Sequence, residues 1–273
     1  MVAAMATRVA TKTTSPEHID YLLRLGDSSL VLGQRLAEWT GHGPVLEEDI
    51  AMANIALDFI GQARLLLTHA GNLEGKGRNE DALAYFRDAR AFRNVTLCEL
   101  PNSGIAKGHG QSADYAFTVV RNLLFCAWQT QLWAALAQSA DAELAAIAAK
   151  SAKETAYHLR HASDWTIRFG DGTPASHERA QAALDQLMPY TNELFATDAV
   201  EEVVAAAGIG VRGAELHAGW KSLVQAILDE SALKMPVASA FQSTGKSGIH
   251  SEHMDYLLIE MQSVARQHPG AQW

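Results

Sequence analysis

The chain has 273 residues, of which 48% are hydrophobic and 19% are charged, a balance typical of a soluble globular protein. Its formal net charge of −9 offers no broad basic surface, so nucleic acid is not an expected partner. The two cysteines, Cys98 and Cys126, form no CxxC pair and indicate buried, reduced thiols in a cytoplasmic protein. We find no uninterrupted apolar run long enough to cross a bilayer, so no membrane association is expected.

The N-terminal residues 1–15 are rich in alanine and threonine and lack the apolar core of a secretory signal. We therefore expect a disordered tail, followed by one helical domain over residues 16–273. Ser15 as N-cap and Pro16 at the first helical position predict a helix that runs to about Trp39. Gly26 indicates a kink or a close helix crossing. The residues expected on its buried side are Ile19, Leu22, Leu23, Leu30 and Ala37.

A second helix is predicted from about Leu46 to His69, with three carboxylates in its first turn, where the helix dipole favours negative charge. Apolar residues recur along it at helical spacing: Leu46, Ile50, Ala53, Leu57 and Ile60. The following residues, 71–81, are predicted to form an exposed loop. Residues 81–100 are predicted to be mostly helical, and a glycine-rich loop is expected to continue through Gly110.

Two further long helices are predicted, one from near Ser112 to about Ser139 and one from the N-cap Asp141 to Phe169. Thr173 and Pro174 predict the start of a helix that reaches about Met188. Shorter helices are expected at about 198–207, 212–231 and 251–267, with Ser251 as the cap of the last one. Two long helices, an interruption of roughly 40 residues and two more long helices predict an all-α fold. It is a ferritin-like four-helix bundle with one long crossover and accessory C-terminal helices.

The fourth long helix carries a polar stripe at steps of four, four, three and four: Lys150, Glu154, His158, His161 and Trp165. These steps place the five side chains on one helix face. A carboxylate and two imidazoles on one face are typical of a metal site in a helical bundle.

A complete di-iron site needs a Glu from each of two helices and a Glu-x-x-His from each of the other two. Asp58 is followed three residues later by Gly61, and Glu154 by Tyr157. His158 comes one residue late, which turns it by about 100° around the helix axis. The third long helix offers neutral amides. We therefore predict no metal, but a buried polar network at four degenerate di-iron positions: Glu38, Asp58, Glu154 and His158.

Three further patterns leave alternatives open. A single metal bound by Glu154, His158 and His161 competes with two histidines that are merely hydrogen-bonded or exposed. The HSEH sequence at 250–253 is a weak zinc motif, because no third ligand is suggested nearby. The STGKSG sequence at 243–248 lacks the spacing of a phosphate loop and a preceding strand.

Several segments are similar to a known family: LEEDIAMANIALDFIGQARLLL at 46–67, FRDARAFRN at 86–94, AKETAYHLRHASDWTIRFGDGT at 152–173 and STGKSGIHSEHMDYLLIEMQ at 243–262. On these segments the chain resembles the C subunits of bacterial phenylacetyl-CoA epoxidases, also called ring-1,2-phenylacetyl-CoA monooxygenases. The resemblance covers most of the chain, from about Leu22 to Trp273.

The resemblance implies a structural, non-catalytic subunit without a cofactor of its own. It also implies three partners: a homologous catalytic subunit that holds the di-iron centre, a small bridging subunit, and a reductase that passes electrons from NADPH. Such a cytoplasmic complex adds one oxygen atom of O2 across the ring of phenylacetyl-CoA in phenylacetate degradation. A homodimer of the isolated chain stays open. The alternative is a stand-alone ferritin-like enzyme with one metal at Glu154, His158 and His161.

Overall fold

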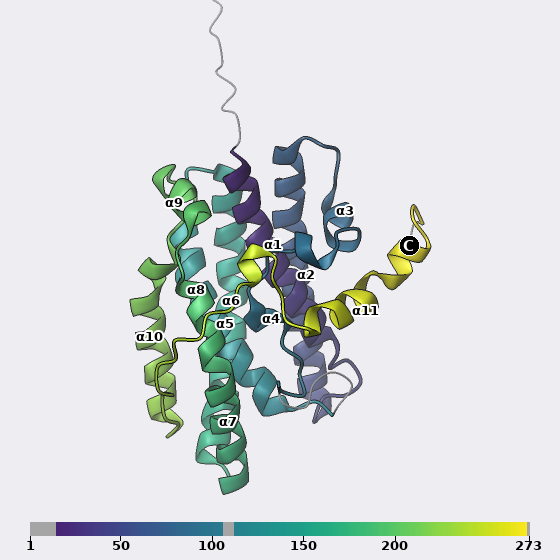
Figure 1. Cartoon of the computed structure of the whole chain (residues 1–273). Coiled ribbons are helices and arrows are strands. Elements are labelled where there is room, and N and C mark those ends of the chain that lie inside the picture. The colour runs from purple at the N-terminus through teal and green to yellow at the C-terminus, as the bar shows by residue number, and fades with distance from the viewer. Residues whose placement is uncertain (1–14, 106–111, 272–273) are drawn as a thin grey trace, which may run out of the picture.

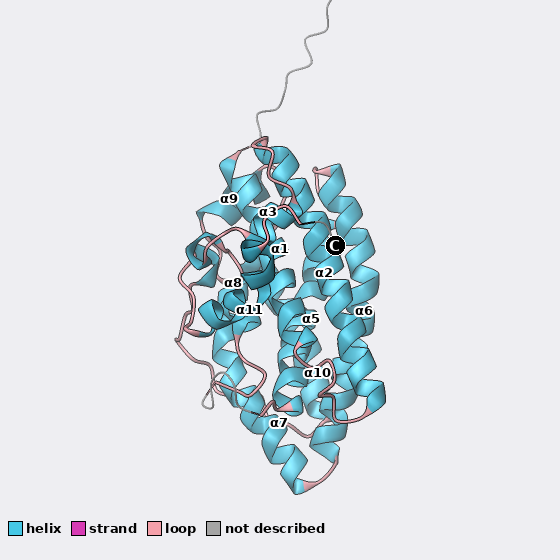
Figure 2. Ribbon diagram, turned by 90° about the vertical axis from the view of Figure 1, so that its right-hand side faces the viewer, coloured by secondary structure: helices cyan, strands magenta, loops and turns pink. Residues whose placement is uncertain are grey.

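The computed structural model describes residues 15–105 and 112–271. Four long helices run side by side along one axis (Figures 1 and 2): α1 (Pro16–Ala37), α2 (Leu46–Glu74), α5 (Tyr115–Leu136) and α6 (Ala142–Asp171). Short loops join α1 to α2 and α5 to α6, so each pair is antiparallel, and residues 75–114 connect the pairs. Within the described ranges there is no named strand, only an isolated bridge between Thr244 and Ile249. The predicted all-α, ferritin-like bundle with one long crossover is confirmed.

Accessory elements cover the outside of the bundle: α7 (Pro174–Leu187), η2 (Met188–Thr191), α8 (Asn192–Phe195), α9 (Ala199–Ala206), α10 (Gly213–Glu230), η3 (Gly245–Ser247) and α11 (His253–Gln267). Helices α7 and α10 pack on α5 and α6, and α9 packs on α1. Helix α11 leaves the bundle and contacts α3 (Glu80–Tyr85) of the crossover (Figure 1). The predicted tail lies, except for Ser15, outside the described residues, as does the end of the loop predicted through Gly110.

Local capping explains where most of the helices begin. The side chains of Ser15, Asp141 and Thr173 each accept hydrogen bonds from backbone amides of the following turn, as predicted. The predicted cap of the last helix is wrong, because α11 starts at His253 with Glu252 as its N-cap. The backbone amide of Ser251 instead donates to Glu99 Oε1 at 2.6 Å.

The crossover is less helical than predicted. Over residues 81–100, which were expected to be mostly helical, the structure has only α3 (Glu80–Tyr85), η1 (Ala89–Ala91) and α4 (Thr96–Glu99). The buried carboxylate of Asp27 on α1 accepts hydrogen bonds from the Arg93 backbone amide at 2.8 Å and from the Arg87 guanidinium at 3.0 Å. Side chains of the bundle thus take hydrogen bonds that a continuous helix would have made within its own backbone. The exposed loop predicted at 71–81 is also shorter, because α2 continues to Glu74 and Gly71 is buried.

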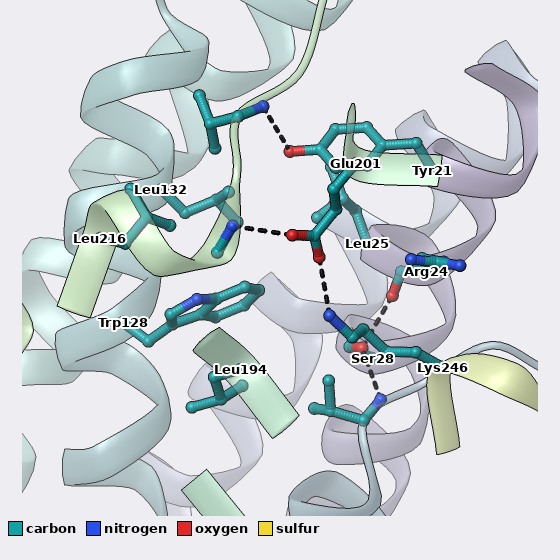
Figure 3. A pocket seen from close by; sticks show the side chains of 13 residues that line it. Tyr21, Arg24, Leu25, Ser28, Trp128, Leu132, Leu194, Glu201, Leu216 and Lys246 are labelled. Atoms are coloured by element: carbon teal, nitrogen blue, oxygen red, sulfur yellow. Dashed lines mark hydrogen bonds and ion pairs between the residues drawn. The ribbon is translucent and has the colours of Figure 1, made fainter. Parts of the chain in front are cut away.

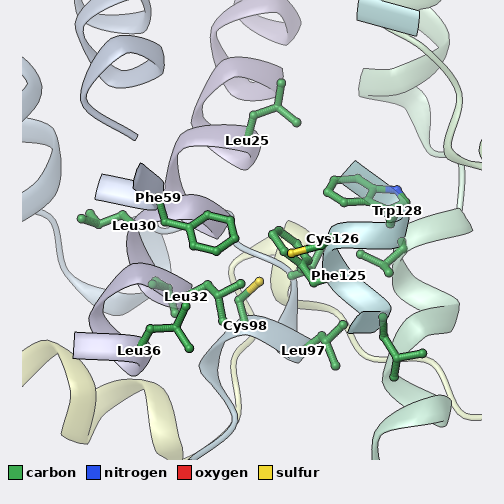
Figure 4. Close-up of a cluster of buried hydrophobic side chains, with 14 of the residues drawn as sticks. Leu25, Leu30, Leu32, Leu36, Phe59, Leu97, Cys98, Phe125, Cys126 and Trp128 are labelled. Atoms are coloured by element: carbon green, nitrogen blue, oxygen red, sulfur yellow. The ribbon is translucent and has the colours of Figure 1, made fainter. Parts of the chain in front are cut away.

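The core draws its buried hydrophobic residues from Tyr21 on α1 to Leu258 on α11. Figure 4 shows part of it, where Cys98 and Cys126 lie among leucine and phenylalanine side chains. Both cysteines are buried free thiols, as predicted. Helix α1 is buried on more sides than predicted, with Val31 and Leu32 inside as well as Leu22 and Leu30, whereas Ile19, Leu23 and Ala37 are only partly buried. That residues 16–273 form a single domain stays a prediction.

The apolar stripe of α2 does not face the core. Leu46 is 72% exposed and Leu57 is 64% exposed, and Ile50 and Ile60 are also exposed. The buried side of α2 is a different face: Met52, Ile55, Phe59, Ala63 and Leu66. Helical periodicity finds both faces but does not say which one is covered.

No apolar segment long enough to cross a bilayer was expected, but α2 meets this criterion. Among the described helices, it alone is long and apolar enough to span a bilayer, by length and composition only. One such helix is weak evidence, because the core helix of a soluble protein passes the same test. Here α2 packs along α1 and against α6.

Two glycines inside long helices should respond oppositely to alanine. A Cβ at Gly170 would lie 1.9 Å from the carbonyl oxygen of Ser231, whereas a Cβ at Gly61 meets nothing within 4 Å. We expect Gly170→Ala to lower the free energy of unfolding by about 1–3 kcal/mol through overpacking. Gly61→Ala should raise it by about 0.5–1 kcal/mol, since alanine favours a helix. Urea unfolding monitored by circular dichroism measures both, and a destabilised Gly61→Ala variant would contradict the packing described for α2.

Candidate functional site

The bundle centre is crossed by a chain of hydrogen-bonded polar side chains from α2, α5 and α6. Gln62 Nε2 donates to Glu154 Oε2 at 3.1 Å, and Gln129 Nε2 donates to Gln62 Oε1 at 3.4 Å. The Thr155 hydroxyl reaches Gln129 Oε1 at 3.5 Å. Gln62, Gln129 and Thr155 are buried, and Lys150 Nζ lies 3.0 Å from the other oxygen of Glu154. The predicted polar network therefore exists at Glu154, and neutral amides make up much of it.

A second pair joins α2 to α6 at the rim of this network. His158 Nε2 donates to Asp58 Oδ2 at 2.9 Å. The imidazole is buried beside Phe59, with ring centroids 5.0 Å apart, but the Asp58 side chain is 40% exposed. The prediction that both groups are hydrogen-bonded is confirmed, whereas a place for Asp58 inside the bundle is wrong.

The neutral form of His158 is the favoured one. Burial lowers the pKa of His158, and the nearby Asp58 and Glu154 carboxylates only partly oppose it. Its Nδ1 is buried without a hydrogen-bond partner among the described residues. A second proton on the ring would therefore have no acceptor.

His161 belongs to a separate cluster nearer the start of α2. His161 Nε2 donates to Glu48 Oε2 at 2.8 Å, and the Tyr115 hydroxyl donates to the same oxygen. Burial disfavours the Glu48 carboxylate, but the hydrogen bonds from Tyr115 and His161 outweigh it and lower the pKa of Glu48. Glu154, His158 and His161 each have a different partner, so the described structure does not assemble the alternative single-metal site.

Glu38 is not part of the bundle centre. It follows the last residue of α1 as its C-cap, where its carboxylate accepts from Arg35 Nη1 at 2.7 Å and from Asn102 Nδ2 at 2.9 Å. The Arg35 side chain is almost fully buried and needs a nearby anion. In the part of the chain that the structure describes, Glu38 shares no hydrogen bond with Asp58, Glu154 or His158. The prediction that placed it with them is wrong.

The donors at the bundle centre do not fit a di-iron group. Two irons are held by several carboxylates and by imidazole nitrogens. Here Glu154 is held by Lys150 and Gln62, and Gln129 contributes only a neutral amide. Gly61 has no side chain to offer, and the site contains one buried imidazole, from His158.

The C-terminal motifs are occupied by side chains of the same chain. In the STGKSG segment, the Lys246 amide and the Ser243 hydroxyl donate to the Glu193 carboxylate, each at 2.7 Å, so this loop binds a carboxylate of its own chain. In the HSEH segment, His250 Nδ1 lies 2.8 Å from Glu99 Oε2. Burial disfavours the charged imidazole of His250, but the hydrogen bond and charge of Glu99 outweigh it and raise the pKa of His250.

A small cavity lies beside the STGKSG segment (Figure 3). Lys246, which lines the cavity, has its Nζ 2.7 Å from Glu201 Oε1. Its volume is about 30 Å³, enough for little more than one water molecule. The cavity is therefore too small for a substrate.

The structure brings together one cluster that was not predicted from the sequence. His18 Nε2 lies 2.8 Å and His69 Nε2 lies 2.6 Å from Asp141 Oδ2. The sequence pattern indicates Asp141 only as a helix cap, and neither His18 nor His69 is predicted as a ligand. The signal was present, because the antiparallel bundle puts the start of α1, the end of α2 and the start of α6 at one end.

Comparison with known proteins gives two matches. The family model described as "Phenylacetic acid catabolic protein" matches residues 1–273. The chain is also 44% identical over 253 residues to the C subunit of the 1,2-phenylacetyl-CoA epoxidase of Escherichia coli (strain K12). That alignment covers 93% of this chain and 98% of the relative.

His158 and His250 predict opposite pH responses, because their pKa values are shifted in opposite directions. Because the pKa of His158 is lowered, its stabilising contribution is present above the unfolded value of about 6.5 and is lost as the pH falls. Because the pKa of His250 is raised, its contribution is present below about 6.5 and is lost as the pH rises through the raised value. The destabilisation caused by His158→Gln should therefore shrink in acid, and that caused by His250→Gln should grow. Urea unfolding at several pH values tests this, and parallel pH profiles would contradict it.

Proposed function

The chain belongs to the phenylacetic acid catabolic protein family, and from this premise we propose that it is a structural, non-catalytic subunit of a phenylacetyl-CoA epoxidase. The observation that supports this most is the hydrogen-bonded chain from Glu154 through Gln62 and Gln129 to Thr155. It fills the place where a ferritin-like oxygenase would hold two irons. A chain without this centre can still contribute to the reaction by supporting a subunit that has one.

The proposed complex contains a homologous catalytic subunit with the di-iron centre, a small bridging subunit and a reductase. The relative in Escherichia coli is itself named as a subunit, which supports partner chains for this protein. We further propose that the complex is cytoplasmic and acts in phenylacetate catabolism, with oxygen chemistry confined to the catalytic subunit.

The exposed stripe of α2 supports a docking surface for the catalytic subunit. Its residues follow steps of four, three, four and three: Leu46, Ile50, Ala53, Leu57 and Ile60. This heptad-like spacing suits packing against another helix. On α6, the exposed Tyr157 and Ala156 follow Thr155 of the polar network. Exposed apolar side chains that gather on one face mark interaction sites on soluble proteins, and stable obligate interfaces typically bury more than about 2,000 Å².

The competing function is a stand-alone ferritin-like enzyme with one metal at Glu154, His158 and His161. Elemental analysis and the visible spectrum in air are compared for the gently purified chain and for Glu154→Gln/His158→Gln, because only a metal lost in this variant supports the competing function. The structural role requires that the chain alone lacks a di-iron centre. Two irons per chain would overturn it, whereas a single metal bound elsewhere would not.

Removing the charge at the bundle centre should leave the reaction largely intact. We expect the double variant Glu154→Gln/His158→Gln to form the complex and to epoxidise phenylacetyl-CoA at close to the normal rate. The stability loss should be about 1–3 kcal/mol, because glutamine keeps bulk and hydrogen-bonding capacity. Turnover is measured with the partner subunits, reductase and NADPH, and size-exclusion chromatography confirms assembly. A rate loss of about 100-fold or more in an assembled complex would instead indicate a catalytic group.

A charge in the α2 stripe should disrupt assembly without unfolding the chain. Leu57→Asp alters an exposed side chain, so the free energy of unfolding should change by no more than about 0.5 kcal/mol. Binding to the catalytic subunit should weaken by about 2 kcal/mol or more if Leu57 lies at the interface centre. The matched control is Ile259→Asp on α11, which is 67% exposed. Calorimetric titration measures both, and normal binding by Leu57→Asp would place the interface elsewhere.

A further inference from the structure

One cluster of metal-binding residue types lies outside the bundle centre, at the end where α1 starts, α2 ends and α6 starts. His18, His69 and Asp141 each offer one ligand atom, and these three atoms lie within 4.8 Å of one another. Each of the three side chains is only 10–12% exposed. Within residues 15–105 and 112–271 no other group of three histidine, cysteine or acidic side chains converges in this way.

The two oxygens of the Asp141 carboxylate have different partners. Asp141 Oδ1 accepts from the backbone amides of Glu143 at 3.0 Å and Leu144 at 3.2 Å, as the N-cap of α6. These amides fix the carboxylate and satisfy Oδ1, so that Oδ2 alone faces the two imidazoles. The N-terminal end of α6, which carries the positive end of the helix dipole, therefore faces Oδ1. The other oxygen, Oδ2, faces the two histidines.

We propose that His18 Nε2, His69 Nε2 and Asp141 Oδ2 bind one divalent first-row transition metal ion of the zinc type. Two imidazoles and one carboxylate are a common protein ligand set for such ions, with water in the remaining position. Metal–nitrogen bonds of about 2.0–2.1 Å place tetrahedral ligand atoms roughly 3.3 Å apart. The present separations of 2.8 and 2.6 Å from Oδ2 are hydrogen-bond lengths, so on metal binding each Nε2 would move away from Oδ2 by roughly 0.5–0.7 Å. For a neutral imidazole, binding requires a change of tautomer by exchange with water: Nε2 gives up its proton, Nδ1 takes one up, and the Nε2 lone pair coordinates the metal.

The ion has a route to this position. His69 lines an open groove of about 780 Å³, together with Thr68, Asn72 and Glu143. The groove lies on the outer surface of α2 and α6, so water can complete the coordination. A bound ion would tie the ends of three bundle helices together, independently of the proposed role in the epoxidase.

The test uses the full-length chain, stripped with a chelator and then titrated with Co²⁺ and Zn²⁺. We expect one Co²⁺ per chain, visible d–d absorption bands that Zn²⁺ abolishes, and a higher melting temperature with either ion. His69→Gln and Asp141→Asn should each weaken binding by at least about 100-fold, more than is typical for loss of an outer-shell partner. Asparagine keeps the capping oxygen, so Asp141→Asn guards against a variant that merely unfolds α6.

Matched controls are His42→Gln, at an exposed loop histidine, and His158→Gln at the bundle centre; both should bind Co²⁺ normally. Absence of saturable binding would show that the cluster is only a hydrogen-bonded triad and would overturn the proposal. Binding that survives both His69→Gln and Asp141→Asn, or that is lost in His158→Gln, would also overturn it. None of these outcomes depends on epoxidase activity.

Discussion

The fold depends on how helix α1 satisfies the charges that it carries into the core. Asp27 is fully buried, and its carboxylate accepts from Arg87 and from the backbone of Arg93 in the crossover. Arg35, buried further along the same helix, donates to the carbonyl oxygens of Glu99 and His253 and to the Glu38 carboxylate. Removing one partner from such a pair typically costs about 3–5 kcal/mol, because the other charge stays buried. The crossover and the start of α11 therefore have to pass close enough to α1 to supply hydrogen-bond partners for Asp27 and Arg35.

Buried polar groups at the bundle centre also need hydrogen-bond partners, and there neutral amides supply most of them. Gln62 hydrogen-bonds to both Gln129 and Glu154, so these polar groups satisfy one another. An apolar replacement of Gln62 would leave Glu154 Oε2 without this hydrogen bond, and Lys150 would remain as the partner of Oε1. The four long helices thus pack around a polar centre whose groups are supplied by the chain itself. The exposed apolar stripe of α2 is the part of the described surface most suited to a partner.

The features that the sequence predicted well depend on residues close together in the chain. Caps such as Ser15 and Asp141 act within one turn, and both accept backbone amides as predicted. The features that it missed depend on distant pairs. Asp27 and Arg93 are 66 residues apart, and Asp27 accepts the Arg93 backbone amide within the segment that was predicted to be mostly helical. Periodicity also could not tell that Leu57 lies outside, because both faces of α2 are apolar. The convergence of His18, His69 and Asp141 needed the bundle topology as well as the residue types.

The two core cysteines have a consequence for chemical durability. Peroxide and related oxidants attack the thiolate form of cysteine. Burial raises the pKa of both Cys98 and Cys126, so neither thiol ionises readily and neither is accessible to solvent. If the chain works beside a subunit that activates O2, reduced oxygen species that escape from that subunit meet no reactive sulfhydryl on its described surface. Irreversible oxidation of cysteine is then not a route by which such species inactivate this chain.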